Sequence, residues 1–255
     1  GEPRVLSPGW ISALGLAWSG DGREVWFTAT GSGGGRALHG VDRAGRLRTI
    51  YRSPGNLTLH DVSTVGRVLV SHDTMRVGLM RGTEGEAETE ASWLDSSLLT
   101  DLSADGRTML FSEFGEGGGP LYSTLLRRAD GGLATRLGDG FATSLSPDGK
   151  RVLAILPKDP PELVVLPTGP GEPERVVTDP VLAVEWATWL PEGGGMLLVG
   201  SARDGGPGLW RLDRGMPARR LAADPVASRF VGAVASPDGR RAAAATADGG
   251  VLLCP

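Results

Sequence analysis

The chain is poor in the residues that build disulfides, cysteine-based metal sites and membrane spans. Its 255 residues include one cysteine, Cys254, which excludes an intrachain disulfide framework and a cysteine metal site. No apolar run approaches the roughly 18 residues that a transmembrane helix needs. The chain begins with Gly1 and shows no signal peptide, so we expect an excised domain or a processed form of a longer protein.

Positive charge is also sparse and scattered. Lysine occurs only at Lys150 and Lys158, and 26 basic against 30 acidic residues give a formal net charge of −4. A nucleic-acid-binding protein is expected to carry a basic face or stripe, and none is visible in the sequence. We therefore predict neither a nucleic-acid partner nor membrane contact by this chain.

Glycine is abundant, and it recurs at a regular spacing. Many of the 40 glycines lie between short apolar runs, where they mark turns. Six such turns, each followed by a second apolar run, are 40 to 46 residues apart and centre on Gly22, Gly66, Gly106, Gly149, Gly193 and Gly239. A period of about 40–50 residues with several strands per period is typical of a β-propeller.

The first period shows the content of one repeat. Its apolar or alternating runs, separated by turn residues, are Ala13–Ser19, Glu24–Ala29, Ala37–Asp42 and Leu47–Tyr51. Four consecutive antiparallel strands make one propeller blade. The sequence therefore predicts an all-β, six-bladed propeller of four-stranded blades, forming a single domain over residues 1–255.

The ends of the chain suggest how the ring closes. The last period, 229–255, lacks an outer strand, whereas Glu2–Ser7 matches the outer strand Glu172–Val177 of the fourth period. We expect strand 2–7 to pair with the blade formed by 229–255, which would remove an open sheet edge. The alternative is a frayed N-terminal tail.

The turn sequences resemble a known repeat. Trp18-Ser19-Gly20-Asp21-Gly22-Arg23 and Leu145-Ser146-Pro147-Asp148-Gly149-Lys150 are similar to the Trp-Ser-Pro-Asp-Gly-Lys repeat of TolB-type (WD-like) propellers. Together with Leu57–Ser63 and Gly115–Pro120, the fourth-blade turn resembles the propeller found C-terminal to bacterial serine/threonine protein kinases. The second and fifth turns depart from the repeat, because Val65 stands at the aspartate position and Leu190 at the serine position.

The resemblance implies a non-catalytic recognition domain, for ligand sensing or protein–protein interaction, in the C-terminal region of such a kinase. The chain itself carries no kinase motif. Two alternatives remain open: a free-standing periplasmic TolB-like protein that binds proteins, and the propeller portion of a prolyl-oligopeptidase-like hydrolase. The compartment also stays open, and an extracytoplasmic part of a membrane-anchored bacterial protein is favoured over a cytoplasmic one.

Polar residues on the first strand of each blade form the candidate site. Counting back five residues from the turn glycines reaches equivalent positions on the six first strands, which are Ala17, Asp61, Asp101, Ser144, Thr188 and Val234, and other polar groups lie nearby on the same strands. The predicted ligand- or partner-binding residues at the channel mouth are His60, Asp61, Asp101, Glu185 and Arg229. The carboxylates can hold a cation or an amine; alternatively, they only accept hydrogen bonds from backbone N–H groups of the inner strands.

Other chemistry has little support in the sequence. The glycine clusters lack the Lys-Ser/Thr pair of a phosphate loop, and no nucleophile elbow occurs. The three histidines fall at different blade positions, so no metal site is predicted. We expect no catalytic residue, no cofactor and a monomer that binds a protein or small molecule at the channel face. The rival is an enzyme that uses the channel carboxylates as acid and base.

Overall fold

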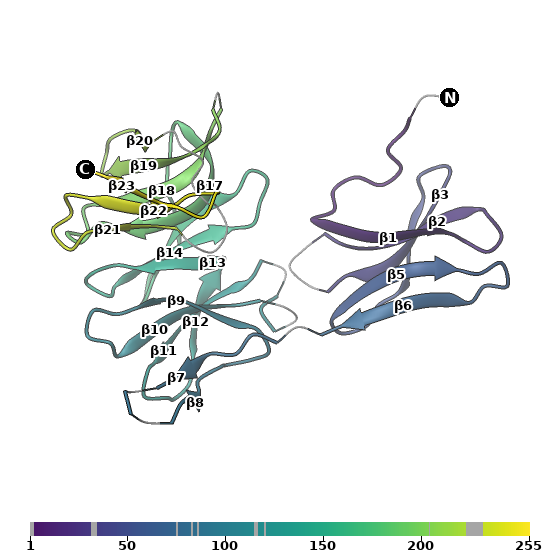
Figure 1. The fold of residues 1–255 in the computed structure, drawn as a ribbon, viewed down its shortest axis with the longest axis horizontal. Coiled ribbons are helices and arrows are strands. Elements are labelled where there is room, and N and C mark those ends of the chain that lie inside the picture. Colours follow the sequence, from purple (N-terminus) through teal and green to yellow (C-terminus); the bar gives the residue numbers. More distant parts are fainter. Residues whose placement is uncertain are drawn as a thin grey trace. The chain divides into compact units, whose positions relative to one another are not determined.

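A computed structural model describes residues 3–255 except 32–34, 75, 83, 86, 115–116, 120, 204 and 223–231. The described part is all β, and none of its residues lies in a helix (Figure 1). Internal contacts divide the chain into two compact units. The first contains residues 1–78, 92–97 and 113–122, and the second contains residues 79–91, 98–112 and 123–255.

The first unit holds two antiparallel sheets. One sheet has the order β1-β2-β3-β4, and the other pairs β5 with β6. Their strands are β1 (Ser12–Trp18), β2 (Glu24–Thr30), β3 (Ala37–Asp42), β4 (Leu47–Tyr51), β5 (Asn56–Val62) and β6 (Val68–Asp73). Leu38 of the first sheet and Leu59 and Val62 of the second are buried together, so apolar side chains join the two sheets.

The second unit holds three four-stranded sheets, one three-stranded sheet and one strand pair among its described residues. One four-stranded sheet contains β9 (Ser97–Leu102), β10 (Thr108–Glu113), β11 (Ser123–Arg128) and β12 (Thr135–Asp139). The next contains β13 (Phe141–Leu145), β14 (Arg151–Leu156), β15 (Glu162–Pro167) and β16 (Glu174–Arg175). The third contains β17 (Val181–Trp189), β18 (Gly195–Ala202), β19 (Pro207–Asp213) and β20 (Arg219–Ala222). The smaller sheets are β21 (Ala233–Ala235), β22 (Ala242–Ala245), β23 (Val251–Cys254) and the pair β7 (Met80–Arg81), β8 (Thr89–Glu90). Ser97 and Glu113, at the ends of β9 and β10, belong to the first unit.

Local hydrogen bonds explain the recurring turn. Ser146 Oγ donates to Asp148 Oδ1 at 2.6 Å, and the N–H of Lys150 donates to the same oxygen at 3.1 Å. The N–H of Arg151 donates to Ser146 Oγ at 2.9 Å, while Gly149 takes the positive φ of 69° that the turn requires. The same bonds form in the turns that begin at Ser19, Ser103 and Ser236. All six predicted turn glycines have positive φ, which confirms the turn positions.

The second predicted blade is divided between the two units. Its turn is one residue shorter than the others: the N–H of Ser63 donates to the carbonyl four residues later, whereas the N–H of Ser146 donates to the carbonyl five residues later. Beyond β6, Val77 makes an isolated parallel bridge to Ser96, and β7 pairs only with β8. Because β5 and β6 belong to the first unit and β7 and β8 to the second, one four-stranded sheet for this blade stays a prediction.

The predicted N-terminal strand also differs. Residues 3–7 lie outside any strand, and the sheet β21-β22-β23 contains three described strands. Leu6 packs against the buried cluster of Phe27, Ala29 and Val41 in the first unit. The pairing of residues 2–7 with the blade of 229–255 stays a prediction.

The best-packed core of the second unit lies between neighbouring sheets. Leu153 and Ile155 of β14 and Val165 of β15 pack against Leu198 of β18 and Trp210 of β19. The sheets that contain these strands lie next to each other in the second unit (Figure 1). The predicted apolar runs 152–156 and 196–199 are almost wholly buried, because each is covered by side chains of an adjacent sheet.

Candidate functional site

Polar side chains join the first strands of three sheets in the second unit. Ser144 Oγ of β13 lies 3.3 Å from Asp101 Oδ2 of β9, to which it donates, and 3.2 Å from Thr188 Oγ1 of β17. These three residues occupy the same repeat position, five before the turn glycine. Counting back from the turns therefore predicted a set of residues that the fold brings together.

The carboxylate of Asp101 is committed to hydrogen bonds. Its Oδ1 accepts from the N–H of Leu102 at 2.8 Å, and its Oδ2 accepts from the N–H of Leu145, on the next sheet, at 2.8 Å. Ser144 Oγ likewise accepts from the N–H of Trp189, one sheet further, at 3.4 Å. The sequence left open whether these carboxylates hold a ligand or accept hydrogen bonds from backbone N–H groups. Asp101 does the second in this structure.

A cavity of about 430 Å³ opens beside this polar chain. Its walls are mostly apolar, with Leu99, Val234 and Val251 exposed at its surface and Thr100, Thr143 and Thr188 adding hydroxyl groups. Asp101 is the only titratable group among the described residues that line it. The cavity suits noncovalent contact with an apolar group better than acid–base chemistry, which needs a free pair of titratable groups.

The other predicted site residues have separate surroundings. In the first unit, exposed His60 has Nε2 3.0 Å from Ser71 Oγ, and exposed Asp61 accepts from the N–H of Val62 at 2.8 Å. In the second unit, Glu185 is half-buried at a β-bulge between Val184 and Trp186. Arg229 lies outside the described residues. Neither unit by itself unites the five residues, so their convergence at one mouth stays a prediction.

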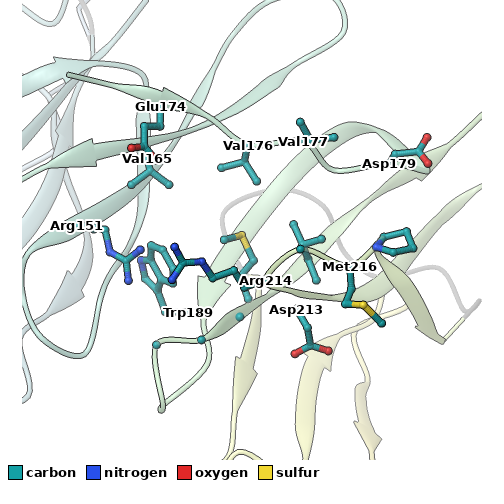
Figure 2. A pocket seen from close by; sticks show the side chains of 17 residues that line it. Arg151, Val165, Glu174, Val176, Val177, Asp179, Trp189, Asp213, Arg214 and Met216 are labelled. Carbon is teal, nitrogen blue, oxygen red and sulfur yellow. The ribbon is translucent and has the colours of Figure 1, made fainter. Parts of the chain in front are cut away.

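A second pocket, of about 610 Å³, lies between the sheet of β13–β16 and the sheet of β17–β20. The guanidinium of Arg151 on β14 stacks over the indole of Trp189 on β17, 4.5 Å from its centroid. Figure 2 shows Arg151, Trp189 and Arg214 gathered at one end of this pocket and Asp179 at the other. Sequence reasoning missed this pocket, because its residues share no motif and are brought together only by the packing of two sheets.

A third cavity, of about 310 Å³, lies in the first unit beside His39. The imidazole is buried 4.7 Å from the Trp10 ring, centroid to centroid, and its Nδ1 lies 3.3 Å from Thr49 Oγ1. Burial lowers the pKa of His39 and favours its neutral form. Nowhere in the described ranges do three or more His, Cys, Asp or Glu side chains gather in a way that could hold a metal ion.

Glu113 is a buried carboxylate that sequence reasoning also missed. Its Oε1 accepts from the N–H of Ser96 at 2.7 Å, and its Oε2 accepts from Ser97 Oγ at 2.6 Å. Both oxygens are thus engaged in holding residues 96–97. A single acidic residue at a strand end carries no sequence signal for this role.

Comparison with known proteins identifies the fold. No family model matches the sequence, and no protein of curated function matches it. TolB from Acinetobacter baumannii is similar with a TM-score of 0.52 and 17% identity, over 95% of this chain and 51% of that one. A TolB-like protein from Agrobacterium tumefaciens is similar with a TM-score of 0.52 and 16% identity, over 98% of this chain and 78% of that one. A gluconolactonase from Xanthomonas campestris is similar with a TM-score of 0.52 and 14% identity, over 98% of this chain and 86% of that one.

These similarities show the fold alone, an all-β fold like that of β-propellers. The chain spans about half the length of the Acinetobacter TolB. The described part contains no helix of the length and apolar character that a membrane crossing requires.

Proposed function

We propose that this chain is a non-catalytic recognition domain that binds a protein or small molecule at the channel face. The observation that supports this proposal is the mostly apolar cavity beside β9, β13, β17 and β21, whose single described titratable group, Asp101, already accepts three hydrogen bonds. Concave apolar surfaces with a few polar groups are typical of binding sites. His60, Asp61, Glu185 and Arg229 remain the proposed further residues of this face.

The proposed context is the C-terminal region of a bacterial serine/threonine kinase, on the strength of the repeat sequence. A periplasmic TolB-like protein and the propeller of a prolyl-oligopeptidase-like hydrolase are the alternatives. The similar gluconolactonase shows that enzymes also use this fold, so the fold by itself does not decide between recognition and catalysis. The commitment of Asp101 to backbone bonds favours recognition.

We further propose that the chain forms one six-bladed ring, closed by residues 2–7. Six turns of regular spacing support this, and so do the apolar side chains of β1 that stay uncovered within the first unit. A propeller sheet whose two faces are both apolar is stable only when both are covered.

The channel face can be tested with a displayed library of random peptides selected on the immobilised chain. Peptides that bind should lose affinity at least about tenfold when a charge enters the cavity in Leu99→Glu or Val234→Glu, because apolar contact is replaced by a desolvated charge. Leu133→Glu, at a residue 85% exposed and not lining the cavity, is the matched control. Equal binding by all three variants would contradict the proposed site. Hydrolysis of a peptide or a lactone by the wild type that disappears in Asp101→Asn would contradict the non-catalytic role.

A further inference from the structure

We propose that the pocket between the sheets of β13–β16 and β17–β20 binds a carboxylate group attached to an apolar body. This site is separate from the channel face, and the proposal does not depend on the function proposed there. The ligand chemistry is shared by small organic acids and by the C-terminus of a peptide.

Two guanidinium groups supply the carboxylate-binding end. The guanidinium of Arg151 lies over the ring of Trp189, and Arg214 extends toward the same end (Figure 2). None of the ion pairs among the described residues includes Arg151 or Arg214. Arg151 does act at longer range on Asp148, whose pKa is lowered by the Ser146 hydroxyl, by the N–H of Lys150 and, to a smaller extent, by the charge of Arg151. A planar guanidinium with free N–H groups is the side chain best suited to bind a carboxylate through two hydrogen bonds.

The same end offers donors rather than acceptors. Nε1 of Trp189 is buried and lacks a hydrogen-bond partner among the described groups. A buried unpaired donor is unfavourable, and such groups often mark the place of a bound water. Trp189 lines this end of the pocket and provides a spectroscopic reporter for it.

Apolar side chains line the space beyond the guanidinium groups. Val165, Val176, Met196, Leu212 and Met216 face the pocket from both sheets and from the turn after β19. Met196 and Leu212 are buried, so the deep wall is dry and apolar. The pocket volume of about 610 Å³ lies within the range of sites for small molecules, roughly 300–1,000 Å³.

Three carboxylates also line the pocket, and they differ in how strongly their charge acts on a bound anion. Asp213 is neutralised by Arg211, whose Nε lies 3.0 Å from Oδ1. Asp179 is exposed at the end opposite Arg151 (Figure 2). Glu174 is exposed on the rim above Val165, where its charge opposes a bound carboxylate. Removing the charge of Glu174 should therefore strengthen binding, whereas removing that of Arg151 or Arg214 should weaken it.

The test uses the whole chain and calorimetric titration with phenylbutyrate, with the neutral phenylbutanol as its isostere. We expect measurable binding of the acid and at least about tenfold weaker binding of the alcohol, because the neutral hydroxyl cannot accept the charge-assisted hydrogen bonds that a carboxylate accepts from the guanidinium groups. Arg151→Gln and Arg214→Gln should each weaken binding of the acid about tenfold, and Glu174→Gln should tighten it. Arg241→Gln is the matched control, because Arg241 follows its turn as Arg151 does but does not line the pocket.

The two sources of the carboxylate are separated by an acetylated tripeptide that ends in phenylalanine, prepared as the free acid and as the amide. Binding of the free acid but not of the amide supports a peptide C-terminus as ligand, whereas binding of phenylbutyrate alone supports a small organic acid. Thermal melts of each variant distinguish lost binding from lost folding, and Arg151→Lys should fold normally but bind less well than the wild type. Equal binding of acid and alcohol, equal loss in Arg241→Gln, or no binding of either acid at millimolar concentration would overturn the proposal. Leu99→Glu should leave phenylbutyrate binding unchanged, so a failure here is distinct from a failure at the channel face.

Discussion

The first strands β1 and β13 occupy the same place in their sheets and precede the same type of turn, yet their surroundings are opposite. In β13, four of the five residues are buried, and Ala142 is fully buried. In β1, Leu14, Leu16 and Trp18 are 48%, 73% and 55% exposed. The strand itself is therefore specified locally, whereas its burial depends on which neighbours cover its two faces.

The joining hydrogen bonds show the same contrast. Asp101 of the second unit accepts bonds from its own strand and from the next sheet. Asp61, at the equivalent position of the first unit, accepts from the adjacent Val62 in the described structure. Within the second unit, the side chain at this repeat position thus joins one sheet to the next.

The largest expected effect concerns burial. Leu153→Ala should lower the free energy of unfolding by about 2–5 kcal/mol, because Leu153 is fully buried between two sheets. If the sheets close into one ring, Leu16→Ala should also be destabilising, by more than about 1 kcal/mol, because a covered leucine loses more than an exposed one. Leu133→Ala, at an exposed site, should stay within about 0.5 kcal/mol of the wild type.

Urea denaturation of the three variants measures these differences. An effect of Leu16→Ala no larger than that of Leu133→Ala would contradict the closed ring. An effect as large as that of Leu153→Ala would show that β1 is covered as fully as the strands of the second unit.

A smaller effect is expected at the joining carboxylates. Asp101→Ala leaves the N–H of Leu145 without its acceptor and removes one of the partners of the Ser144 hydroxyl, so it should cost about 1–3 kcal/mol. Asp61→Ala removes one exposed local bond and should cost less than Asp101→Ala. Hydrogen exchange adds a local measurement, since the amide of Leu145 should exchange faster in Asp101→Ala. Equal losses in the two variants would show that Asp61 also joins two strands.

The smallest effect is a pKa shift in the turns. The Ser146 hydroxyl, followed by the N–H of Lys150, holds the pKa of Asp148 below its ordinary value. Ser146→Ala should raise this pKa toward the ordinary value in an NMR titration, while Ser236→Ala should raise the pKa of Asp238 and leave Asp148 unchanged.

The sign of the accompanying pH dependence follows from the lowered pKa. The stabilisation from ionised Asp148 is fully present above the pKa of the unfolded chain and is lost as the pH falls through the lower pKa of the folded chain. Acid should therefore reduce the stability of the wild type more than that of Ser146→Ala. An unchanged Asp148 pKa in Ser146→Ala would contradict the role of the hydroxyl.

Much of the fold could be predicted because its signals lie within a few residues of each other. The turn from Ser146 to Arg151 is held by bonds among its own residues, and the positive φ of Gly149 follows from the same motif. The regular spacing of such turns also located Asp101, Ser144 and Thr188 at equivalent positions, which the structure joins.

Other features required the tertiary structure. The short pairing of β7 with β8 has no signal in the turn spacing. The pocket of Arg151, Trp189 and Arg214 combines residues from different strands and a turn, with no common motif. The sequence by itself determined the turns, the strands and the repeat positions, because these depend on local hydrogen bonds and apolar patterning. Only the tertiary structure decided which faces are covered and where a pocket opens, because both depend on contacts between residues far apart in the chain.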